Sequence, residues 1–324
     1  MNSSDYYANS TVFDIKTWPN AVAAGLMLLN SILGLLFNAV IIHNFISDKQ
    51  QKTSFNLVCV FRAINNFIVL ITMLAVFLPA IILGVSYYDP VVETVIITFA
   101  VNLMVFNEFQ GIYLAVNRLT AIYFPLKYHL FFGIKLTFFF HILYYADRIR
   151  NVTMETIGRM EKDPHEYLLF SIEYLAYGGL LESPDFMFVW ALGLILFPFL
   201  LNAITYIKIY QLKKKTTRDS EHWKTAKQNM AQFFQTVIQD SLFSVSVIFT
   251  MKLNTAINHR FWTFICQTLI WQSVHVSDGF IMLMFNEKLT LFKRKLKVSP
   301  LGTVAKQPEI SMRNTSTALP DITH

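Results

Sequence analysis

The chain has 324 residues, of which 54% are hydrophobic and only 15% are charged, and its formal net charge is +6. A soluble domain of this size could not bury so large an apolar fraction in one core, so the composition predicts an integral membrane protein. The basic residues lie in short clusters beside apolar runs, and no zinc-finger, helix-turn-helix or RNA-binding pattern occurs. We therefore attribute the positive charge to membrane topology and expect no nucleic-acid partner.

The N-terminal stretch, MNSSDYYANSTVFDIKTW, is polar and has no basic region leading into an apolar one, so it lacks the pattern of a cleavable signal peptide. We expect residues 1–20 to form an extracellular tail. Asn2 and Asn9 each begin an Asn-X-Ser/Thr triplet and are candidate glycosylation sites in such a tail.

Six apolar runs are long enough to cross a bilayer, which takes about 20 mostly apolar residues. They are Ala21–Ile46, Leu57–Gly84, Val91–Phe124, Phe186–Ile209, Phe233–Leu253 and Phe261–Phe285. A further run, Leu136–Ala146, has only about half that length and is followed at once by polar sequence. Its length alone favours an interfacial or re-entrant segment.

The positions of Lys and Arg decide whether the short run is a span, because short loops rich in these residues stay in the cytoplasm. The rule places the loops around Lys49 and Lys127 and the cluster Lys213–Lys215 inside. An even number of membrane crossings must then separate the Lys127 loop from Lys213–Lys215, and the apolar run Phe186–Ile209 supplies one of them. The other is either Leu136–Ala146 or Tyr167–Leu181, and we favour the first.

The sequence thus predicts an all-α integral membrane protein, a seven-helix transmembrane bundle over residues 21–285 with its N-terminus outside. The fourth helix, near 136–146, is expected to be short or distorted, and residues 147–185 to form a polar outer loop with Asn151 as a third candidate glycosylation site. Residues 286–298 alternate apolar and basic side chains, which predicts an amphipathic helix on the lipid of the inner leaflet. A disordered cytoplasmic tail is expected over 299–324.

Four ordered stretches carry a family resemblance: FNLVCVFRAINN, AVNRLTAIYFPLKYHLFF, FFQTVIQDSLFSV and WQSVHVSDGFIMLMFNEKL. Taken together, they resemble the nematode serpentine chemoreceptors of class x (Srx), within the rhodopsin-like G-protein-coupled receptor superfamily. The resemblance covers the chain apart from roughly Tyr144–Pro184.

This resemblance implies a chemosensory receptor in the plasma membrane, of a sensory cilium, that binds a small molecule and signals to a heterotrimeric G protein through the inner ends of helices 3, 5 and 6. It implies neither a cofactor nor an enzymatic activity. The candidate residues for G-protein coupling are Asn117, Arg118, Lys213, Lys214 and Lys215. The three Lys would serve equally as stop-transfer charge that binds anionic lipid. We expect Arg118 to snorkel toward the cytoplasmic face until the inner ends of the helices separate.

The outer parts of helices 3, 5, 6 and 7 would line the ligand pocket by resemblance, around Ala100, Met104, Phe188, Phe249 and Phe264. These side chains carry no formal charge, which favours a small uncharged or amphipathic ligand.

The sequence also departs from the rhodopsin-like pattern. Asn117 stands where an acidic residue usually precedes the motif Arg, and Asp278-Gly279 stands where Asn-Pro is usual. The two Cys, Cys59 and Cys266, both lie inside apolar runs and are expected to be small buried hydrophobes. They offer neither a disulfide framework nor a metal site, so the usual disulfide to the second outer loop cannot form.

Polar side chains within the expected spans form a candidate intramembrane network, because charges in spans face the bundle and find partners there. The members are Asn38, Arg62, Asn66, Asn107, Glu108, Asp240, His275 and Asp278. Arg62 and Asp278 lie about two turns inside the cytoplasmic ends of their spans, so we predict that they form an ion pair completed by Asn66. Asp240, at a comparable depth, is the competing partner.

Two other classes of function remain as alternatives. A membrane transporter or channel would also use charged residues in spans, but the chain has no inverted repeat and no paired Gly/Pro-broken spans. An enzyme is disfavoured because no HExxH, Gly-x-Ser-x-Gly or phosphate-loop pattern occurs. A receptor relic with a damaged fourth span is a further alternative.

Overall fold

The computed structural model describes residues 18–162, 169–177, 184–215 and 221–285, which all lie in one compact unit, Met1–Asn286. The expected amphipathic helix at 286–298, the tail at 299–324 and the candidate glycosylation sites Asn2 and Asn9 lie outside the described residues.

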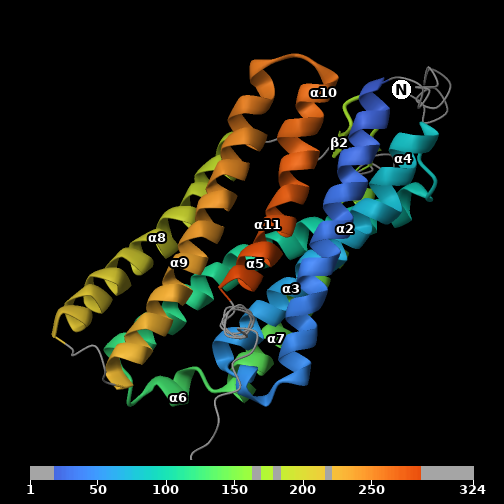
Figure 1. The fold of residues 1–324 in the computed structure, drawn as a ribbon. Coiled ribbons are helices and arrows are strands. Elements are labelled where there is room, and N and C mark those ends of the chain that lie inside the picture. The colour runs from blue at the N-terminus through green and yellow to red at the C-terminus, as the bar shows by residue number, and fades with distance from the viewer. Residues whose placement is uncertain (1–17, 163–168, 178–183, 216–220, 286–324) are drawn as a thin grey trace, which may run out of the picture. The chain divides into compact units, whose positions relative to one another are not determined.

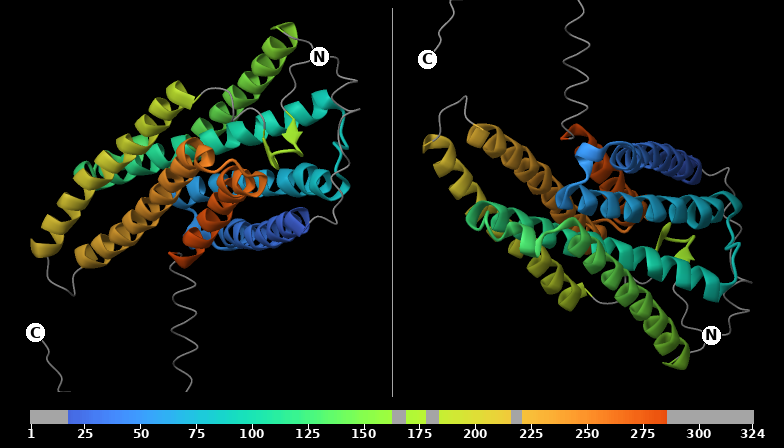
Figure 2. Two further views of the ribbon diagram at one scale, coloured as in Figure 1. Left: turned by 90° about the horizontal axis from the view of Figure 1, so that it is seen from above. Right: turned by 90° about the horizontal axis from the view of Figure 1, so that it is seen from below.

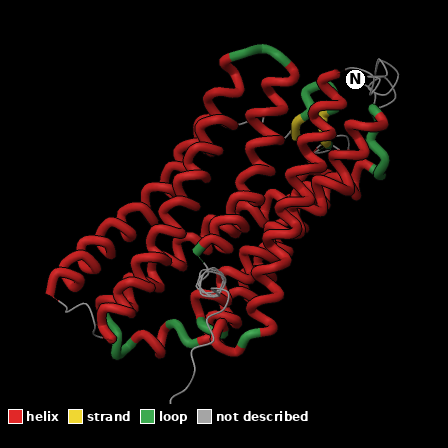
Figure 3. The backbone as a smooth tube through the Cα atoms, viewed as in Figure 1, coloured by secondary structure: helices red, strands yellow, loops and turns green. Residues whose placement is uncertain are grey.

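The described residues are mostly helical (Figures 1 and 3). The long helices are α2 (Trp18–Ser47), α3 (Ser54–Thr72), α5 (Pro90–Tyr123), α7 (Ile134–Lys162), α8 (Pro184–Lys215), α9 (Glu221–Ile248) and α11 (Ile270–Met284). Shorter helical pieces are η1 (Lys49–Gln51), η2 (Met73–Phe77), α4 (Leu78–Leu83), α6 (Tyr128–Phe131), η4 (Phe249–Leu253), η5 (Asn254–Ala256), α10 (Arg260–Thr263) and η6 (Phe264–Leu269). Two short strands, β1 (Phe170–Ser171) and β2 (Ala176–Tyr177), pair in antiparallel fashion. The predicted all-α membrane architecture is confirmed.

Local sequence explains where several helices begin and end. The Asp89 side chain accepts a hydrogen bond from the Val91 N–H (2.9 Å) ahead of α5, whose first residue is a proline. Thr53 caps α3 by accepting from the Asn56 N–H (3.2 Å). At the other end of the same span, α4 stops at Gly84, which adopts the left-handed conformation (φ 68°) that favours glycine.

Among the described residues, six helices are long and apolar enough to cross a membrane by length and composition: Trp18–Ser47, Ser54–Leu83, Pro90–Tyr123, Tyr128–Gly158, Ala191–Leu212 and Met230–Ala256. The helix formed by α10, η6 and α11 is a seventh of comparable length, and we expect it to span as well. It falls outside the six because Gln267, Gln272, His275 and Asp278 lower its mean hydropathy.

The fourth span is the helix α7, which the sequence favoured over the competing segment at Tyr167–Leu181. The described part of that segment is instead the β1–β2 hairpin. The helix differs from expectation in its length, because α7 continues beyond Ala146 to Lys162, through part of the expected outer loop. Helix formation needs good helix formers rather than apolar ones, and DRIRNVTMETIGRMEK contains no proline. Only the apolar part of α7 is short.

The helices pack in an order that brings distant parts of the chain together. α2 packs against α3 and α11, α5 lies between α3 and α8, and α9 packs against α8 and α11 (Figures 1 and 2). The α2–α3 connection, α6 and the C-terminal end of α8 lie at one end, which is the lower end in Figure 1. These segments carry the Lys residues that the charge rule places inside, so we refer to this end as the inner end.

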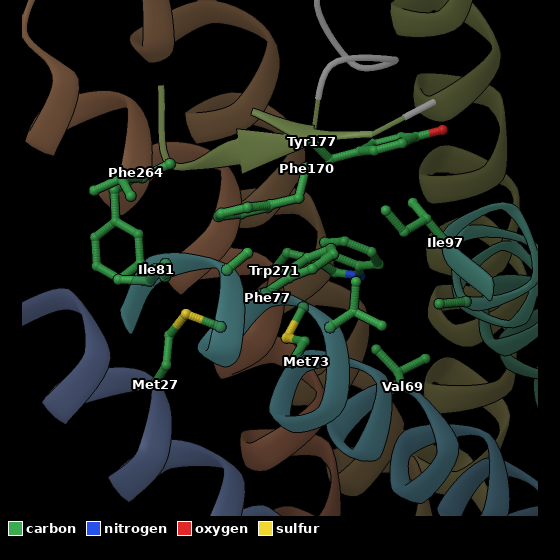
Figure 4. Close-up of a cluster of buried hydrophobic side chains, with 14 of the residues drawn as sticks. Met27, Val69, Met73, Phe77, Ile81, Ile97, Phe170, Tyr177, Phe264 and Trp271 are labelled. Carbon is green, nitrogen blue, oxygen red and sulfur yellow. The ribbon is translucent and has the colours of Figure 1, made fainter. Parts of the chain in front are cut away.

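The main apolar core lies in the outer half of the bundle, beneath the hairpin. Phe170 from β1 stacks on Phe77 with ring centroids 4.6 Å apart, and Phe77 contacts Trp271 of α11 (6.2 Å). Figure 4 shows these rings in a column below the hairpin. Leu175, at the hairpin turn, is fully buried in the same core.

Candidate functional site

A buried ion pair joins α3 to α11 in the inner half of the bundle. The Arg62 Nε donates to Asp278 Oδ2 at 2.7 Å, and both side chains are almost completely buried. The predicted pairing of these two residues is therefore observed. A second N–H of Arg62, on Nη1, donates to the Asn107 carbonyl on α5 (3.2 Å), so the guanidinium ties three helices together.

Asp278 is the centre of this arrangement because it accepts from three side chains, two on α3 and one on α9. Besides Arg62, the Asn66 Nδ2 donates to its Oδ2 (2.7 Å) and the Gln239 Nε2 of α9 donates to its Oδ1 (2.6 Å). A buried charge pair offsets its desolvation only when further hydrogen bonds satisfy it. Asp278 meets that condition.

The network extends from this pair through a row of amides. The Asn66 Oδ1 accepts from the Asn107 Nδ2 (2.7 Å) and from the His275 Nδ1 (2.7 Å). The Asn66 Nδ2 also donates to the Asn38 Oδ1 of α2 (3.2 Å). The sequence-predicted members Asn38, Arg62, Asn66, Asn107, His275 and Asp278 are thus one connected cluster.

Asp240, the competing partner, accepts from the Asn202 Nδ2 of α8 (3.2 Å). It still approaches the cluster: a Cβ placed on Gly111 of α5 would lie 3.3 Å from Asp240 Oδ1 and 3.7 Å from Arg62 Nη1. Glu108, on the same helix as Gly111, is also buried. The Arg62 guanidinium therefore lies close to the carboxyl group of Asp240 as well as that of Asp278. This close approach is possible because Gly111 has no side chain.

The missing side chain of Gly279 is part of the network geometry. A Cβ there would lie 2.6 Å from Asn38 Nδ2 and 2.9 Å from both Asn38 Cγ and Oδ1. Asn38 cannot easily retreat, because its Nδ2 donates to the Gly34 carbonyl (2.8 Å) and its Oδ1 accepts from Asn66.

We expect Gly279→Ala to lower the free energy of unfolding by about 1–3 kcal/mol, the usual effect of overpacking a filled interior. Gly25→Ala is the matched control, since a Cβ at Gly25 of α2 meets no atom within 4 Å. It should be neutral or stabilising by up to about 1 kcal/mol, because alanine favours a helix over glycine. Thermal unfolding of the purified variants in detergent measures both, and equal effects would contradict the close approach.

Arg118 lies near the inner end of α5 but does not snorkel. Its side chain is only 1% exposed, its Nη2 donates to Thr236 Oγ1 on α9, and its guanidinium lies 5.8 Å from the Phe55 ring centroid. The expectation of a cytoplasm-facing Arg118 is corrected, because α9 and Phe55 cover it. Its Nε and Nη1 have no hydrogen-bond partner among the described residues.

The remaining coupling candidates lie in two places. Asn117 is buried beside Arg118, where its Nδ2 donates to Ser54 Oγ (3.3 Å) and its Oδ1 accepts from the Tyr128 hydroxyl (3.3 Å). Lys213–Lys215 form the C-terminal end of α8, where Lys214 is exposed; the side chains of Lys213 and Lys215 lie outside the described residues.

The expected pocket residues are brought together only in part. Ala100 and Phe264 are fully buried in the outer core, and Met104 packs against it. Phe249 is half-buried in η4 and is not a member of that core, and the Phe188 side chain lies outside the described residues.

The hairpin that closes this core is held without a disulfide. The Glu93 Oε1 accepts from the Phe170 N–H (2.9 Å), and the Thr268 hydroxyl donates to the Leu175 carbonyl (2.7 Å). The Arg260 Nη2 donates to the Ile172 carbonyl (2.8 Å). Cys59 and Cys266 are both buried free thiols in helices, so polar contacts to α5, η6 and α10 replace the covalent link.

A shallow cleft of about 420 Å³ lies beside the hairpin turn at the outer end. It is lined by Glu173, Tyr174, Asn254, Thr255, Ile257, Asn258, Arg260 and Thr263. Both an acidic and a basic side chain line it, in contrast to the apolar core beneath the hairpin.

A family model for serpentine type 7TM GPCR chemoreceptor Srx matches residues 28–286 of the chain. The chain belongs to the Srx family. No curated protein matches it. Srx proteins are seven-helix membrane receptors, a receptor class rather than an enzyme class, so the multi-pass topology and the general type of protein follow. The matched range also includes the stretch Tyr144–Pro184, which the four sequence stretches leave uncovered.

Sequence reasoning missed several residues of this Srx chain. The Thr236 hydroxyl accepts a hydrogen bond from Arg118. The Tyr145 hydroxyl donates to Asn65 Oδ1 (2.6 Å), a contact that residue spacing does not predict. Asn65 itself donates to Asn107 Oδ1 (2.8 Å) and joins the network. The signal for Asn65 was available, since it directly precedes Asn66. The sequence gives no indication of the contacts of Thr236 or of the hairpin, because their partners are distant in the chain.

The expected setting of Asn151, a glycosylation site in an outer loop, is also corrected. This residue lies within helix α7, where its Nδ2 donates to Asp147 Oδ2 (3.2 Å), rather than in an outer loop. Glycosylation acceptors lie on exposed surface loops, so this position does not have the expected setting.

Proposed function

We propose that this Srx chain is a chemosensory receptor of the plasma membrane that binds a small uncharged or amphipathic molecule beneath the outer hairpin. On binding, it signals to a heterotrimeric G protein through the inner ends of α5, α8 and α9. The observation that carries this proposal is Arg118, a buried cation that one hydroxyl from α9 holds in place. Outward movement of α9 would expose it.

The outer half supports the ligand part of the proposal. Ala100, Met104 and Phe264 contribute apolar surface to the core, and the hairpin covers them through Phe170 and Leu175. Pockets for small molecules are mostly apolar with a few polar groups. The hairpin ties to Glu93, Thr268 and Arg260 are hydrogen bonds, which a ligand can exchange more easily than a disulfide.

The polar network supports the transmission part, because it joins α11 to α9, the helix that covers Arg118. Gln239 lies one turn from Thr236 on α9 and donates to Asp278 of α11. A displacement of α11 beneath the hairpin would therefore act on the same helix that covers Arg118. This gives two sites and one shared element, as coupling between sites requires.

Recruitment of a G protein in cells expressing the chain, measured across a panel of small neutral and amphipathic compounds, tests the function. We expect a saturable, compound-dependent response and no compound-dependent movement of ions or solute across the membrane. Flux of a solute without G-protein recruitment would show that the chain is a transporter or channel and not a receptor. Buried charges within the membrane are also typical of transporters and channels.

The hairpin provides an internal control for the ligand site. Thr268→Val removes the hydroxyl that binds the Leu175 carbonyl while keeping the side-chain volume similar. The compound concentration giving a half-maximal response should change in this variant, whereas G-protein recruitment at saturation should not.

A further inference from the structure

The C-terminal half of α7 begins at the middle of the bundle. The Tyr144 ring stacks on Phe106 with centroids 4.2 Å apart, and Phe106 lies at the centre of α5 (Pro90–Tyr123). Tyr145 binds Asn65, which lies near the centre of the span Ser54–Leu83. Tyr144 and Tyr145 therefore mark, on α7, the level of the middle of the membrane.

Residues after Tyr145 run from this level toward the outer end. The helices α5 and α7 are antiparallel, since Tyr113, nearer the inner end of α5, contacts the earlier residue His141 (5.6 Å). At 1.5 Å per residue, Asp147–Arg150 lie within about 8 Å of the middle. The hydrocarbon layer extends about 15 Å on each side, so these charges fall inside it.

Asp147 and Arg150 lie on the outside of the bundle, whereas the Arg148 side chain is mostly covered. Asp147 accepts from Arg148 (2.6 Å) and Arg150 (2.8 Å), yet the Arg150 side chain is 71% exposed. Met154 (64%) and Ile157 (46%) are exposed beside it, whereas Val152 and Thr156 face the bundle. Figure 2 shows this half of α7 at the edge of the helix bundle; over its whole length, α7 packs mainly against α5 and α3.

Lipid is a poor cover for this surface. Even a paired Asp–Arg loses its hydration in hydrocarbon, and here the Asn151 side chain, which donates to Asp147 and accepts from Arg150, replaces only part of it. A protein surface with complementary charges would replace that hydration.

We propose that a second copy of this chain covers the α7 outer face, defined as Asp147, Arg150, Met154, Glu155 and Ile157, in a twofold dimer. Two copies in one membrane have the same orientation, so a twofold axis along the membrane normal places the two α7 helices parallel. Arg150 and Glu155 are five residues apart, which is the spacing from a g to the next e position at which charges pair across parallel helices. Both side chains are exposed.

The chemistry of the face suits such a pair. Arg150 of each copy meets Glu155 of the other, and the guanidinium retains N–H groups for this contact while it binds Asp147, because it has five. Met154 and Ile157 supply apolar packing between the two helices. The face carries both signs of charge, so it is complementary to itself.

Charge reversal in two differently tagged copies tests the dimer by resonance energy transfer in membranes. Arg150→Glu and Glu155→Arg should each weaken self-association by about tenfold or more, since each creates two like-charge contacts across the interface. Co-expressed with each other, the two variants should associate as well as the unchanged chain, because both contacts are then of opposite sign. Arg150→Glu combined with Glu155→Arg in one chain should also restore self-association.

Lys135→Glu is the matched control, because Lys135 is an exposed side chain at the inner end of the same helix. This charge reversal should leave self-association unchanged. The mutual rescue separates the interface from misfolding, because a misfolded variant would not be restored by a second charge reversal. Failure of the mixed pair to associate, or an unchanged chain that is monomeric at low expression, would overturn the parallel dimer. G-protein recruitment is not needed for this measurement, so its outcome is independent of the proposed function.

Discussion

Asp278→Ala is expected to lower the free energy of unfolding by about 3–5 kcal/mol, because it leaves the buried Arg62 guanidinium without its counter-ion. It also removes an acceptor of Asn66 and of Gln239, so three donors on two helices, α3 and α9, lose a partner. Arg62→Ala should cost less, since the carboxylate of Asp278 keeps both amide donors. Thermal unfolding in detergent and surface expression measure both effects.

The double variant distinguishes an ion pair from two independent buried groups. Arg62→Ala with Asp278→Ala should be less damaged than the sum of the single variants, by about 0.5–3 kcal/mol. A cycle of Arg62 with Asp240 is the matched comparison, because Asp240 binds Asn202 instead. Additivity in the first cycle together with coupling in the second would transfer the ion pair to α9.

Arg118→Ala is expected to reduce G-protein signalling to background while leaving ligand binding and surface expression largely intact. Its side chain makes a single side-chain hydrogen bond, to Thr236, among the described residues, so its loss removes little from the closed structure. The guanidinium would act only after α9 moves. Equal loss of binding and signalling would show that Arg118 is a structural residue.

Thr236→Val provides the complementary variant, because it keeps Arg118 and removes the hydroxyl that holds it. A hydrogen bond to a charged group contributes about 1.5–3 kcal/mol, so its loss should raise the fraction of open receptor by about tenfold or more. We expect increased signalling without ligand. Unchanged basal signalling in Thr236→Val, with signalling lost in Arg118→Ala, would mean that another contact holds α9 closed.

The sequence by itself determined the class of protein and the number of spans, and it predicted the pairing of Arg62 with Asp278 while leaving Asp240 as a competing partner. These follow from quantities that are linear along the chain. The length of an apolar run sets a span, the Lys and Arg positions set its direction, and a fixed rise per residue sets the depth of each charge. Two charges of opposite sign at one depth, on spans that are neighbours in a receptor bundle, could therefore be matched.

Only the tertiary structure decided how each helix is rotated and what covers its ends. The burial of Arg118 under Thr236, the attachment of Asn65 to Tyr145 and the seat of Leu175 beneath the outer hairpin all join segments far apart in the chain. The exposed Asp147–Arg150 pair belongs here too, because the polar sequence after Ala146 was expected to form a loop, whereas α7 continues through it with Val152 and Thr156 facing the bundle. Depth along a helix can be counted from the sequence, but the direction in which a side chain leaves that helix depends on its neighbours.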